Sequence, residues 1–469
     1  PACAAGWIAV IRGILDLRRK YVGARVTTAD RGRWATVRWL FRRRPPTREE
    51  LLAFQSRQLR RLIDHAYRHV PYYHQLFDRH RLAPGDIRSA ADLAALPLTA
   101  KRDLQANPAS LLARGLDPRR LVVHRTTGST GEPTVVRRTR FEERLLSALR
   151  FRAIRHLGYR VTDRTARVAV VRSTGSGAVR PPRLLQRLSL LRVEHVHSLL
   201  DPPLIVDALE RFRPDVVTGI SAPLARVARF LASHEQGMIR PRFVVVGGEV
   251  VTPLMRRQIR TGFQAPVFEW YGSVEFNLLA WECPTSGDLH TCDDGAIVEV
   301  VRDGRPVAPG ERGEVVVTGL HGFAMPLVRY RLGDVATRGP DPCECGAPYA
   351  TIRAVQGRMH DWFVLPGGRL IHPFELIWQL QDDLPWIRQY QLVQEREDRI
   401  TLRVEPRAEA PPSAATLAEL EARVARPLGP GVTLSIALVP TIEPEPGGKQ
   451  RVSRSLLGSE YDTIDWARV

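Results

Sequence analysis

The chain has 469 residues, of which 44% are hydrophobic and 25% are charged, so it is long enough for two or three domains and too apolar for a disordered protein. Its formal net charge is +19, from 69 basic residues against 50 acidic ones. The basic residues are spread along the whole sequence, which favours a general arginine bias over a nucleic-acid-binding surface. No apolar run reaches the roughly 20 residues of a membrane-spanning helix. We therefore expect a soluble, globular protein without a specific nucleic-acid partner.

Residues 1–44 form a basic N-terminal extension in which apolar residues precede a run of arginines. A solvated extension packed on the body of the protein is the favoured interpretation, and peripheral contact with an anionic membrane is the alternative. The segment lacks the small-residue cleavage site of a signal peptide. The five cysteines are too few and too unevenly placed for a secreted disulfide framework, which favours a cytoplasmic protein.

The next elements follow from capping signals and hydrophobic periodicity. Thr47-Arg48-Glu49-Glu50 is a capping box and predicts the start of an amphipathic helix, after which a helical, loop-rich stretch runs to about residue 120. Short valine-rich runs then alternate with helical patterns, which predicts a largely parallel sheet covered by helices. The expected strands are 121–124, 167–171, 215–218, 243–246 and 266–270, and the expected helices are 141–157, 204–212, 222–235 and 253–262.

The last third of the chain changes character twice. Residues 295–335 have glycine turns between strand-like runs, which predicts an appended β subdomain. After about residue 360 the order strand, helix, strand, strand, helix, strand predicts a separate, small α+β domain.

Residues 126–134, TTGSTGEPT, follow the first expected strand. Glycines in such a turn let backbone N–H groups wrap phosphate oxygens, and the hydroxyls donate as well. The segment lacks the lysine of the Walker-type pattern G-x-x-x-x-G-K-[ST], which disfavours that class of NTPase. Taken alone, it fits either a phosphate-binding loop or a glycine-rich surface loop.

Lysine and cysteine each give one further hint. Only three of the 69 basic residues are lysines, namely Lys20, Lys101 and Lys449, so a lysine in the glycine turn at 446–451 suggests a need for a compact point charge. Cys343 and Cys345 are one residue apart, and Cys283 is followed by His290 and Cys292. Four such ligands could close a tetrahedral zinc site, but the spacing alone fits free buried cysteines equally well.

Five further motifs follow TTGSTGEPT in order: Gly247-Gly248-Glu249, Tyr271-Gly272-Ser273-Val274-Glu275, Tyr330-Arg331-Leu332-Gly333-Asp334, Gly357-Arg358-Met359-His360-Asp361 and Gly447-Gly448-Lys449. The series resembles the ATP-binding motifs of the adenylate-forming (acyl-CoA synthetase) superfamily, in its branch of phenylacetate–CoA ligase, CapK-like and coenzyme F390 synthetase-like proteins. The resemblance implies an α/β fold with a large ATP- and substrate-binding N-terminal domain at 45–359. That domain has parallel sheets covered by helices plus the β subdomain. A small, mobile C-terminal α+β lid follows at 360–469.

The resemblance also implies roles for individual residues. Lys449 would stabilise the charge that develops at the α-phosphate, Glu275 would bind Mg²⁺, and Asp334 would accept hydrogen bonds from the ribose hydroxyls. Gly248 and Glu249 would line the adenine pocket, on which Tyr271 would stack. His360 and Asp361 would lie at the hinge. The residues expected to bind ATP are Thr126, Thr127, Gly128, Ser129, Thr130, Gly131, Gly248, Glu249, Tyr271, Gly272, Ser273, Asp334 and Arg358.

Several relatives have a similar arrangement of cysteines and histidine, which moves the interpretation toward a structural zinc ion. Its ligands would be Cys283, His290, Cys343 and Cys345, and it would tie the β subdomain together. Two residues depart from the pattern of the branch. Glu132 stands where phenylacetate ligases often have lysine, and His360 stands where an acidic residue is common.

The leading hypothesis for function is ATP-dependent adenylation of a small, aromatic carboxylic acid followed by transfer to CoA. The enzymatic alternative keeps the adenylation but uses an amine or a carrier protein as acceptor, or leaves AMP on the substrate as F390 synthetase does. An inactive ligase scaffold that acts as a basic binding protein is the third hypothesis. Members of this branch often form homodimers.

Overall fold

The computed structural model describes residues 36, 39, 42, 44–125, 134–169, 190–234, 239–358, 362–380, 384, 386–444 and 450–457. The loop 126–131, the hinge residues His360 and Asp361, and Lys449 lie outside these residues, and Arg358 is described only by its backbone. Within the described part of the chain, the helices are all too short or too polar to cross a bilayer.

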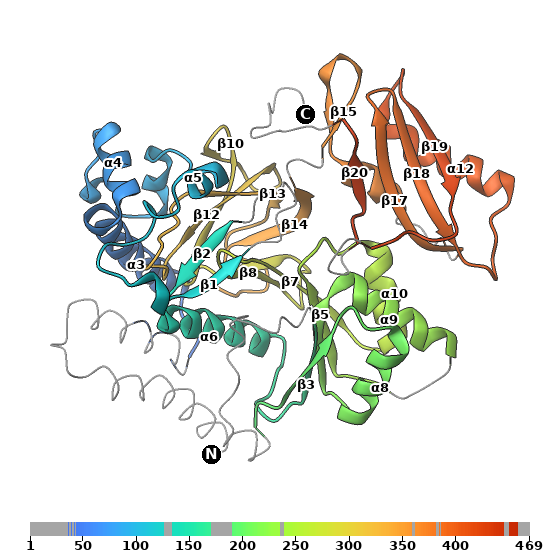
Figure 1. Ribbon diagram of the computed structural model, residues 1–469, viewed down its shortest axis with the longest axis horizontal. Helices are drawn as coiled ribbons and strands as arrows, with labels where there is room; N and C mark the ends of the chain where they lie inside the picture. The colour runs from blue at the N-terminus through green and yellow to red at the C-terminus, as the bar shows by residue number, and fades with distance from the viewer. Residues whose placement is uncertain are drawn as a thin grey trace.

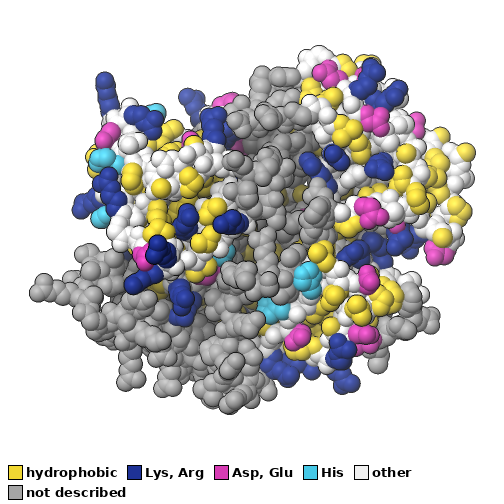
Figure 2. All heavy atoms as spheres, in the orientation of Figure 1, with side chains coloured by type: hydrophobic (Ala, Val, Ile, Leu, Met, Phe, Trp, Pro, Cys, Tyr) yellow, Lys and Arg dark blue, Asp and Glu magenta, His cyan; other side chains and the backbone are white. Residues whose placement is uncertain are grey.

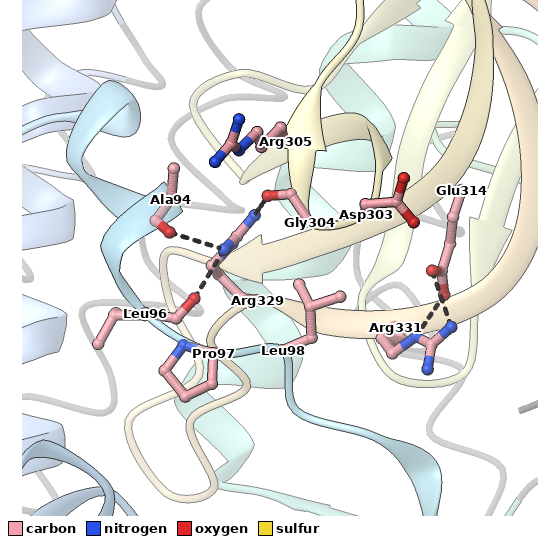
Figure 3. A pocket seen from close by; sticks show the side chains of 10 residues that line it. All are labelled: Ala94, Leu96, Pro97, Leu98, Asp303, Gly304, Arg305, Glu314, Arg329 and Arg331. Atoms are coloured by element: carbon pink, nitrogen blue, oxygen red, sulfur yellow. Dashed lines mark hydrogen bonds and ion pairs between the residues drawn. The ribbon is translucent and has the colours of Figure 1, made fainter. Parts of the chain in front are cut away.

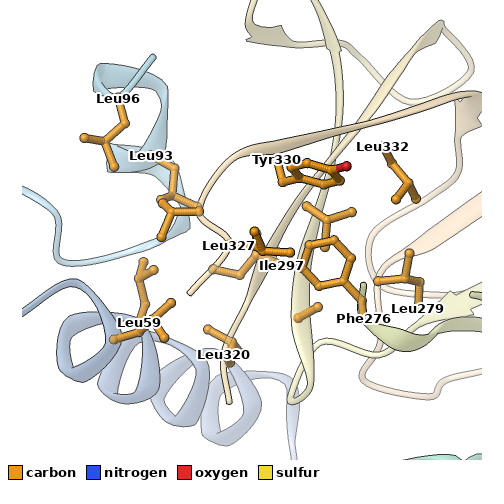
Figure 4. Close-up of a cluster of buried hydrophobic side chains, with 14 of the residues drawn as sticks. Leu59, Leu93, Leu96, Phe276, Leu279, Ile297, Leu320, Leu327, Tyr330 and Leu332 are labelled. Carbon is orange, nitrogen blue, oxygen red and sulfur yellow. The ribbon is translucent and has the colours of Figure 1, made fainter. Parts of the chain in front are cut away.

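Three helices near the start cover the β subdomain. They are α3 (Arg48–His69), α4 (Pro71–Arg79) and α5 (Lys101–Ala106). The predicted capping box is confirmed, because the Thr47 side chain accepts from the Glu50 N–H and the Glu50 carboxylate accepts from the Thr47 N–H. The apolar side of α3, including Leu59, packs into the large core cluster drawn in Figure 4, where it meets Leu320, Leu327 and Ile297 of the β subdomain.

The predicted parallel strands are confirmed, and they form one end of a 12-stranded sheet. Five strands run parallel in the order β7-β6-β5-β3-β4, and helices cover both faces (Figure 1). The strands are β3 (Thr165–Ala169), β4 (Val193–His197), β5 (Val216–Ile220), β6 (Phe243–Gly247) and β7 (Val267–Ser273). The helices are α6 (Arg140–His156), α8 (Pro202–Phe212), α9 (Ser221–His234) and α10 (Pro253–Phe263).

Alternation along β6 explains the two helical layers. Val244 and Val246 pack into the cluster formed with α8, α9 and α10, whereas Phe243 and Val245 pack on the side of α6. Successive side chains of a strand point to opposite faces, so both faces of this strand are apolar and buried, as is usual for a parallel sheet.

The β subdomain is not a separate sheet. A tight turn after Ser273 brings β8 (Asn277–Glu282) back antiparallel to β7, and the same 12-stranded sheet then continues through β9, β14, β13, β12, β10 and β11. The predicted β subdomain therefore continues the parallel strands, because β7 and β8 share a hydrogen-bonded edge. The remaining strands are β9 (Leu289–Thr291), β10 (Ala296–Arg302), β11 (Arg305–Pro306), β12 (Arg312–Gly319), β13 (Tyr330–Arg338) and β14 (Thr351–Arg358).

Two short strands stand apart from this sheet. β1 (Val122–Arg125) and β2 (Val135–Arg138) pair antiparallel as a hairpin, so the strand expected before the glycine-rich segment is not part of the parallel sheet. Thr139 caps α6 directly after β2, again with a capping box, because its side chain accepts from the Glu142 N–H.

The C-terminal part has its own sheet and core, shown in orange and red in Figure 1. Its four-stranded sheet has the order β19-β18-β17-β20, and β15 and β16 form a separate hairpin. The short β16 and β20 add two strands to the predicted order. The elements are β15 (Phe363–Val364), β16 (Leu370–Ile371), α11 (Pro373–Ile377), β17 (Ile387–Arg396), β18 (Arg399–Pro406), α12 (Ala414–Ala425), β19 (Thr433–Leu438) and β20 (Ser453–Ser455).

Candidate active site

Tyr271 and Asp334 meet at the centre of the large sheet although 63 positions separate them. Tyr271 lies near the end of β7 and Asp334 lies in β13, opposite Arg358 of β14 in the strand register. The Tyr271 hydroxyl donates to Oδ2 of Asp334 at 2.6 Å, and both side chains are buried. The hydrogen bond thus joins Tyr271 to Asp334 across strands that are not neighbours in the sheet, and Arg358 stands opposite Asp334 in the next strand.

The β1–β2 hairpin is tied to the turn after β7 through Arg138, at the end of the hairpin where Val122 pairs with Arg138. Arg138 of β2 donates to the carbonyl oxygen of Val274, which directly precedes Glu275. Arg138 also pairs with Glu143 of α6 at 3.2 Å, and the same carboxylate oxygen lies 2.9 Å from Nε2 of His124 in β1. Burial alone would raise the pKa of Glu143, but the hydrogen bonds from His124 and Arg138 hold that pKa below its usual value.

The Val122–Arg138 end of the hairpin therefore lies at the turn that carries Glu275, whereas residues 126–133 connect its Arg125–Val135 end. Glu275 is half-buried, which leaves its carboxylate accessible to a cation. The Oγ of Ser273 is buried and has no hydrogen-bond partner among the described residues. A hydroxyl of this kind loses hydration on burial, so it is suited to a ligand that supplies the missing bond.

The motif Gly247-Gly248-Glu249 turns the chain sharply at the end of β6. Gly248 has a φ of +84°, and a Cβ on Gly247 would stand 2.3 Å from the Trp270 ring, so neither position accepts a larger side chain without strain. The turn points the Glu249 carboxylate at two backbone N–H groups, those of Ala222 at the start of α9 and of Gln450 in the C-terminal part.

The four predicted metal ligands come together. One ligand atom from each of Cys283, His290, Cys343 and Cys345 lies within 4.8 Å of all the others, and the Cys345 sulfur is 3.3 Å from His290 Nε2. Burial, and then the neighbouring His156, lower the pKa of His290 to about 4, which keeps the imidazole neutral at pH 7. Cys292, the remaining cysteine among the described residues, is buried elsewhere, near Asp294 and Arg152.

Sequence reasoning missed the residues that support these positions. Glu143, Arg138 and His124 fix the hairpin, and Arg256 of α10 pairs with Glu282 of β8. Each of these contacts joins elements that are far apart in the sequence or depends on the rotation of a helix. No local sequence motif therefore predicts them.

A cavity of about 380 Å³ lies between residues 94–98 and the turn before β11 (Figure 3). Arg331 lines it, but Tyr271, Glu275 and Asp334 do not. The charges of Arg329 and Arg331 are already paired with Glu299 and Glu314. This cavity is therefore separate from the candidate active site.

No protein-family model matches the chain, but individual proteins do. The chain is 28% identical over 374 residues to the phenylacetate–coenzyme A ligase of Thermus thermophilus, covering 76% of this chain and 82% of that ligase. It is 21% identical over 325 residues to the CapK protein of Staphylococcus aureus, covering 67% and 69%.

The fold matches that of 2-hydroxyisobutyryl-CoA ligase at 22% identity. With the post-adenylation state of that ligase the TM-score is 0.74, covering 85% of this chain and 88% of the other. With its thioesterification state the TM-score is 0.60, covering 88% and 91%. The predicted adenylate-forming fold is confirmed.

Proposed function

We propose that this chain, a relative of the phenylacetate–coenzyme A ligases and CapK with the fold of adenylate-forming CoA ligases, is an ATP-dependent acid–CoA ligase. Its substrate is a small carboxylic acid, for which we propose an aromatic one. The observation that carries the proposal is the meeting of Tyr271, Asp334 and the Glu275 turn at the end of β7, in a chain that also has the remaining motifs in order.

The reaction has two steps. The carboxylate oxygen of the acid attacks the α-phosphorus of ATP, which forms an acyl-adenylate and releases pyrophosphate. The CoA thiolate then attacks the acyl carbonyl carbon, which forms the thioester and releases AMP. Asp334 accepts hydrogen bonds from the ribose hydroxyls, which an ionised carboxylate can do for both at once. Lys449 neutralises the charge that develops on the α-phosphate in the first step.

The half-buried carboxylate at Glu275 fits Mg²⁺, a hard cation that prefers oxygen ligands. When bound, the ion would neutralise part of the triphosphate charge. Residues 126–131 supply backbone N–H groups and hydroxyls for the same phosphates. Homodimer formation and membrane contact through residues 1–44 stay predictions.

Pyrophosphate release tests the proposal. The wild-type protein is incubated with ATP, Mg²⁺ and a panel of aryl and aliphatic acids, with and without CoA. We expect acid-dependent release that Lys449→Ala lowers by at least about a hundredfold, because it removes a charge that acts in the transition state. Lys101→Ala, which changes the one lysine in the described residues, is the matched control. Absence of ATP binding in the wild type would refute the ligase.

We further propose that Cys283, His290, Cys343 and Cys345 bind a structural zinc ion. Their ligand atoms are within 4.8 Å of one another, and a tetrahedral shell with Zn–S bonds of about 2.3 Å requires ligand separations of roughly 3.5 to 4 Å. A modest contraction would therefore close the site. The ion would join the β8–β9 turn to the segment before β14. Reduced thiols at these positions fit the predicted cytoplasmic location.

Metal analysis checks the zinc site. The purified protein should contain about one zinc ion per chain, and Cys343→Ser should lose it and unfold several degrees earlier. Cys292→Ser, which changes a buried cysteine outside the cluster, should keep the metal even if it lowers stability. Equal zinc content in the wild type and in Cys343→Ser would exclude the site.

A further inference from the structure

Glu249 joins the two parts of the molecule through its carboxylate. One oxygen accepts from the N–H of Ala222, the second residue of α9, so the side chain is anchored on the large sheet. The other oxygen accepts from the N–H of Gln450 at 2.9 Å. A carboxylate has acceptor sites on both oxygens, so Glu249 can hold two backbone donors at once.

Gln450 is fixed from the opposite side as well. Its side-chain Nε2 donates to the carbonyl oxygen of Tyr390 in β17 at 3.3 Å, and Gln391 donates to the carbonyl oxygen of Arg451 at 2.8 Å. The segment 450–451 is therefore held between β17 and the turn after β6. Lys449 lies outside the described residues, but it is covalently joined to Gln450, and consecutive Cα atoms are about 3.8 Å apart.

The surroundings of this contact are an interface rather than an isolated bond. Val250 and Leu254 pack against the core cluster of the C-terminal part, and Gln258 of α10 donates to the carbonyl oxygen of Arg388 at 3.0 Å. The relative placement of the two parts also agrees better with the post-adenylation than with the thioesterification state of the ligase compared above, as the two TM-scores show.

We propose that Glu249 is a positioning residue for the adenylation step: it holds the amide of Gln450, the residue directly after Lys449, against the turn that follows β6. The contact is made only in this arrangement of the two parts and is released for the CoA step. This inference rests on the proposed function. It changes the expected role of Glu249, whose carboxylate binds the C-terminal part instead of lining the adenine pocket.

Three substitutions separate the amide contact from other effects. Glu249→Gln keeps the size of the side chain but replaces one acceptor with an NH₂ donor, which would face an N–H group. Gln450→Pro removes the N–H that Glu249 accepts and leaves Glu249 unchanged. Gln450→Ala removes the bond to Tyr390 but keeps the backbone amide, so it is the matched control for Gln450→Pro.

The two half-reactions are measured separately. Phenylacetate with ATP and Mg²⁺ reports the first, as pyrophosphate release, and preformed phenylacetyl-adenylate with CoA reports the second. We expect Glu249→Gln and Gln450→Pro to slow adenylation by roughly tenfold to a hundredfold, because each removes one charge-assisted contact. The rate of thioester formation should stay within about twofold of the wild-type rate. The double variant should be no slower than either single one. Equal losses in both half-reactions would indicate contact with adenine and overturn the inference.

Hydrogen exchange gives a readout that needs no substrate. In wild type and Glu249→Gln, mass spectrometry follows the peptide that contains the Gln450 amide. We expect faster exchange in the variant at an unchanged melting temperature, because the amide has lost its acceptor. Unchanged exchange would refute the contact. If exchange shifts while the wild type neither binds ATP nor releases pyrophosphate with any acid, the contact stands as a structural one and the proposed ligase fails instead.

Discussion

Asp334 depends on Tyr271 for its orientation. The 2.6 Å hydrogen bond uses one carboxylate oxygen and fixes the side chain where little water reaches it. Since both residues sit on neighbouring regions of one sheet, the carboxylate is held before any ligand arrives. A preorganised acceptor loses less entropy on binding ribose than a freely rotating one does.

The contributions of Asp334 and Tyr271 to ATP binding can be measured by substituting each residue in turn. Asp334→Asn replaces an acceptor oxygen with a donor, so we expect ATP affinity to fall by about tenfold or more. Tyr271→Phe keeps the ring and removes only the hydroxyl, so we expect a smaller loss, of roughly twofold to fivefold. Calorimetric titration with ATP in the absence of acid would report both. A larger loss for Tyr271→Phe than for Asp334→Asn would contradict the assignment of Asp334 to the ribose.

Among the secondary-structure elements, β7, β8 and α10 are joined by a group of three charged residues. Arg256 of α10 pairs with Glu282 of β8 at 2.8 Å and lies 3.4 Å from Glu269 of β7. Burial is the main cause that raises the pKa of Glu269 to about 7, with Arg256 opposing it and the Glu282 charge adding to it. One arginine cannot fully neutralise two carboxylates at such short range.

The sign of the resulting pH dependence follows from linkage. Because the folded protein holds the Glu269 proton up to about pH 7 while the unfolded chain releases it near the ordinary value of 4.5, the free energy of unfolding falls as pH rises between these values. Glu269→Gln should flatten this slope, by on the order of 2 kcal/mol between pH 5 and pH 8. Urea unfolding of both proteins across that range measures the difference. Parallel slopes would show that Glu269 ionises normally.

Local signals in the sequence predicted the elements more fully than their contacts. The box at Thr47 predicted the start of its helix because capping is decided by neighbours in the chain, and the helix expected at 253–262 is found at Pro253–Phe263. β4 was missed, since its sequence VEHVH is half polar. The grouping of Cys283, His290, Cys343 and Cys345 was predicted from the family resemblance, because the spacing alone fitted free cysteines equally well. The Glu249–Gln450 contact could not be, because 201 positions separate the two residues and backbone amides carry no sequence signature.

At the scale of the whole molecule, the two parts meet at more than one place. Besides the contact at Glu249, Arg312 of β12 pairs with Glu375 of α11 at 2.8 Å. Both side chains of this pair keep about a quarter to a third of their exposure, so water screens the interaction. Half-exposed ion pairs of this kind contribute about 1 kcal/mol or less.

Substitution of Glu375 therefore distinguishes two explanations for why the C-terminal part must contact the large sheet. If the C-terminal part only needs to be attached, then Glu375→Ala and Glu249→Gln should slow adenylation to a similar extent, since each removes one contact between the same two parts. If the position of the Lys449 turn is what matters, Glu375→Ala should leave both half-reactions within about twofold while Glu249→Gln slows only the first. We expect the second result, because a screened ion pair contributes little to how the two parts are held, whereas the contact at Glu249 fixes the residue next to the proposed catalytic lysine.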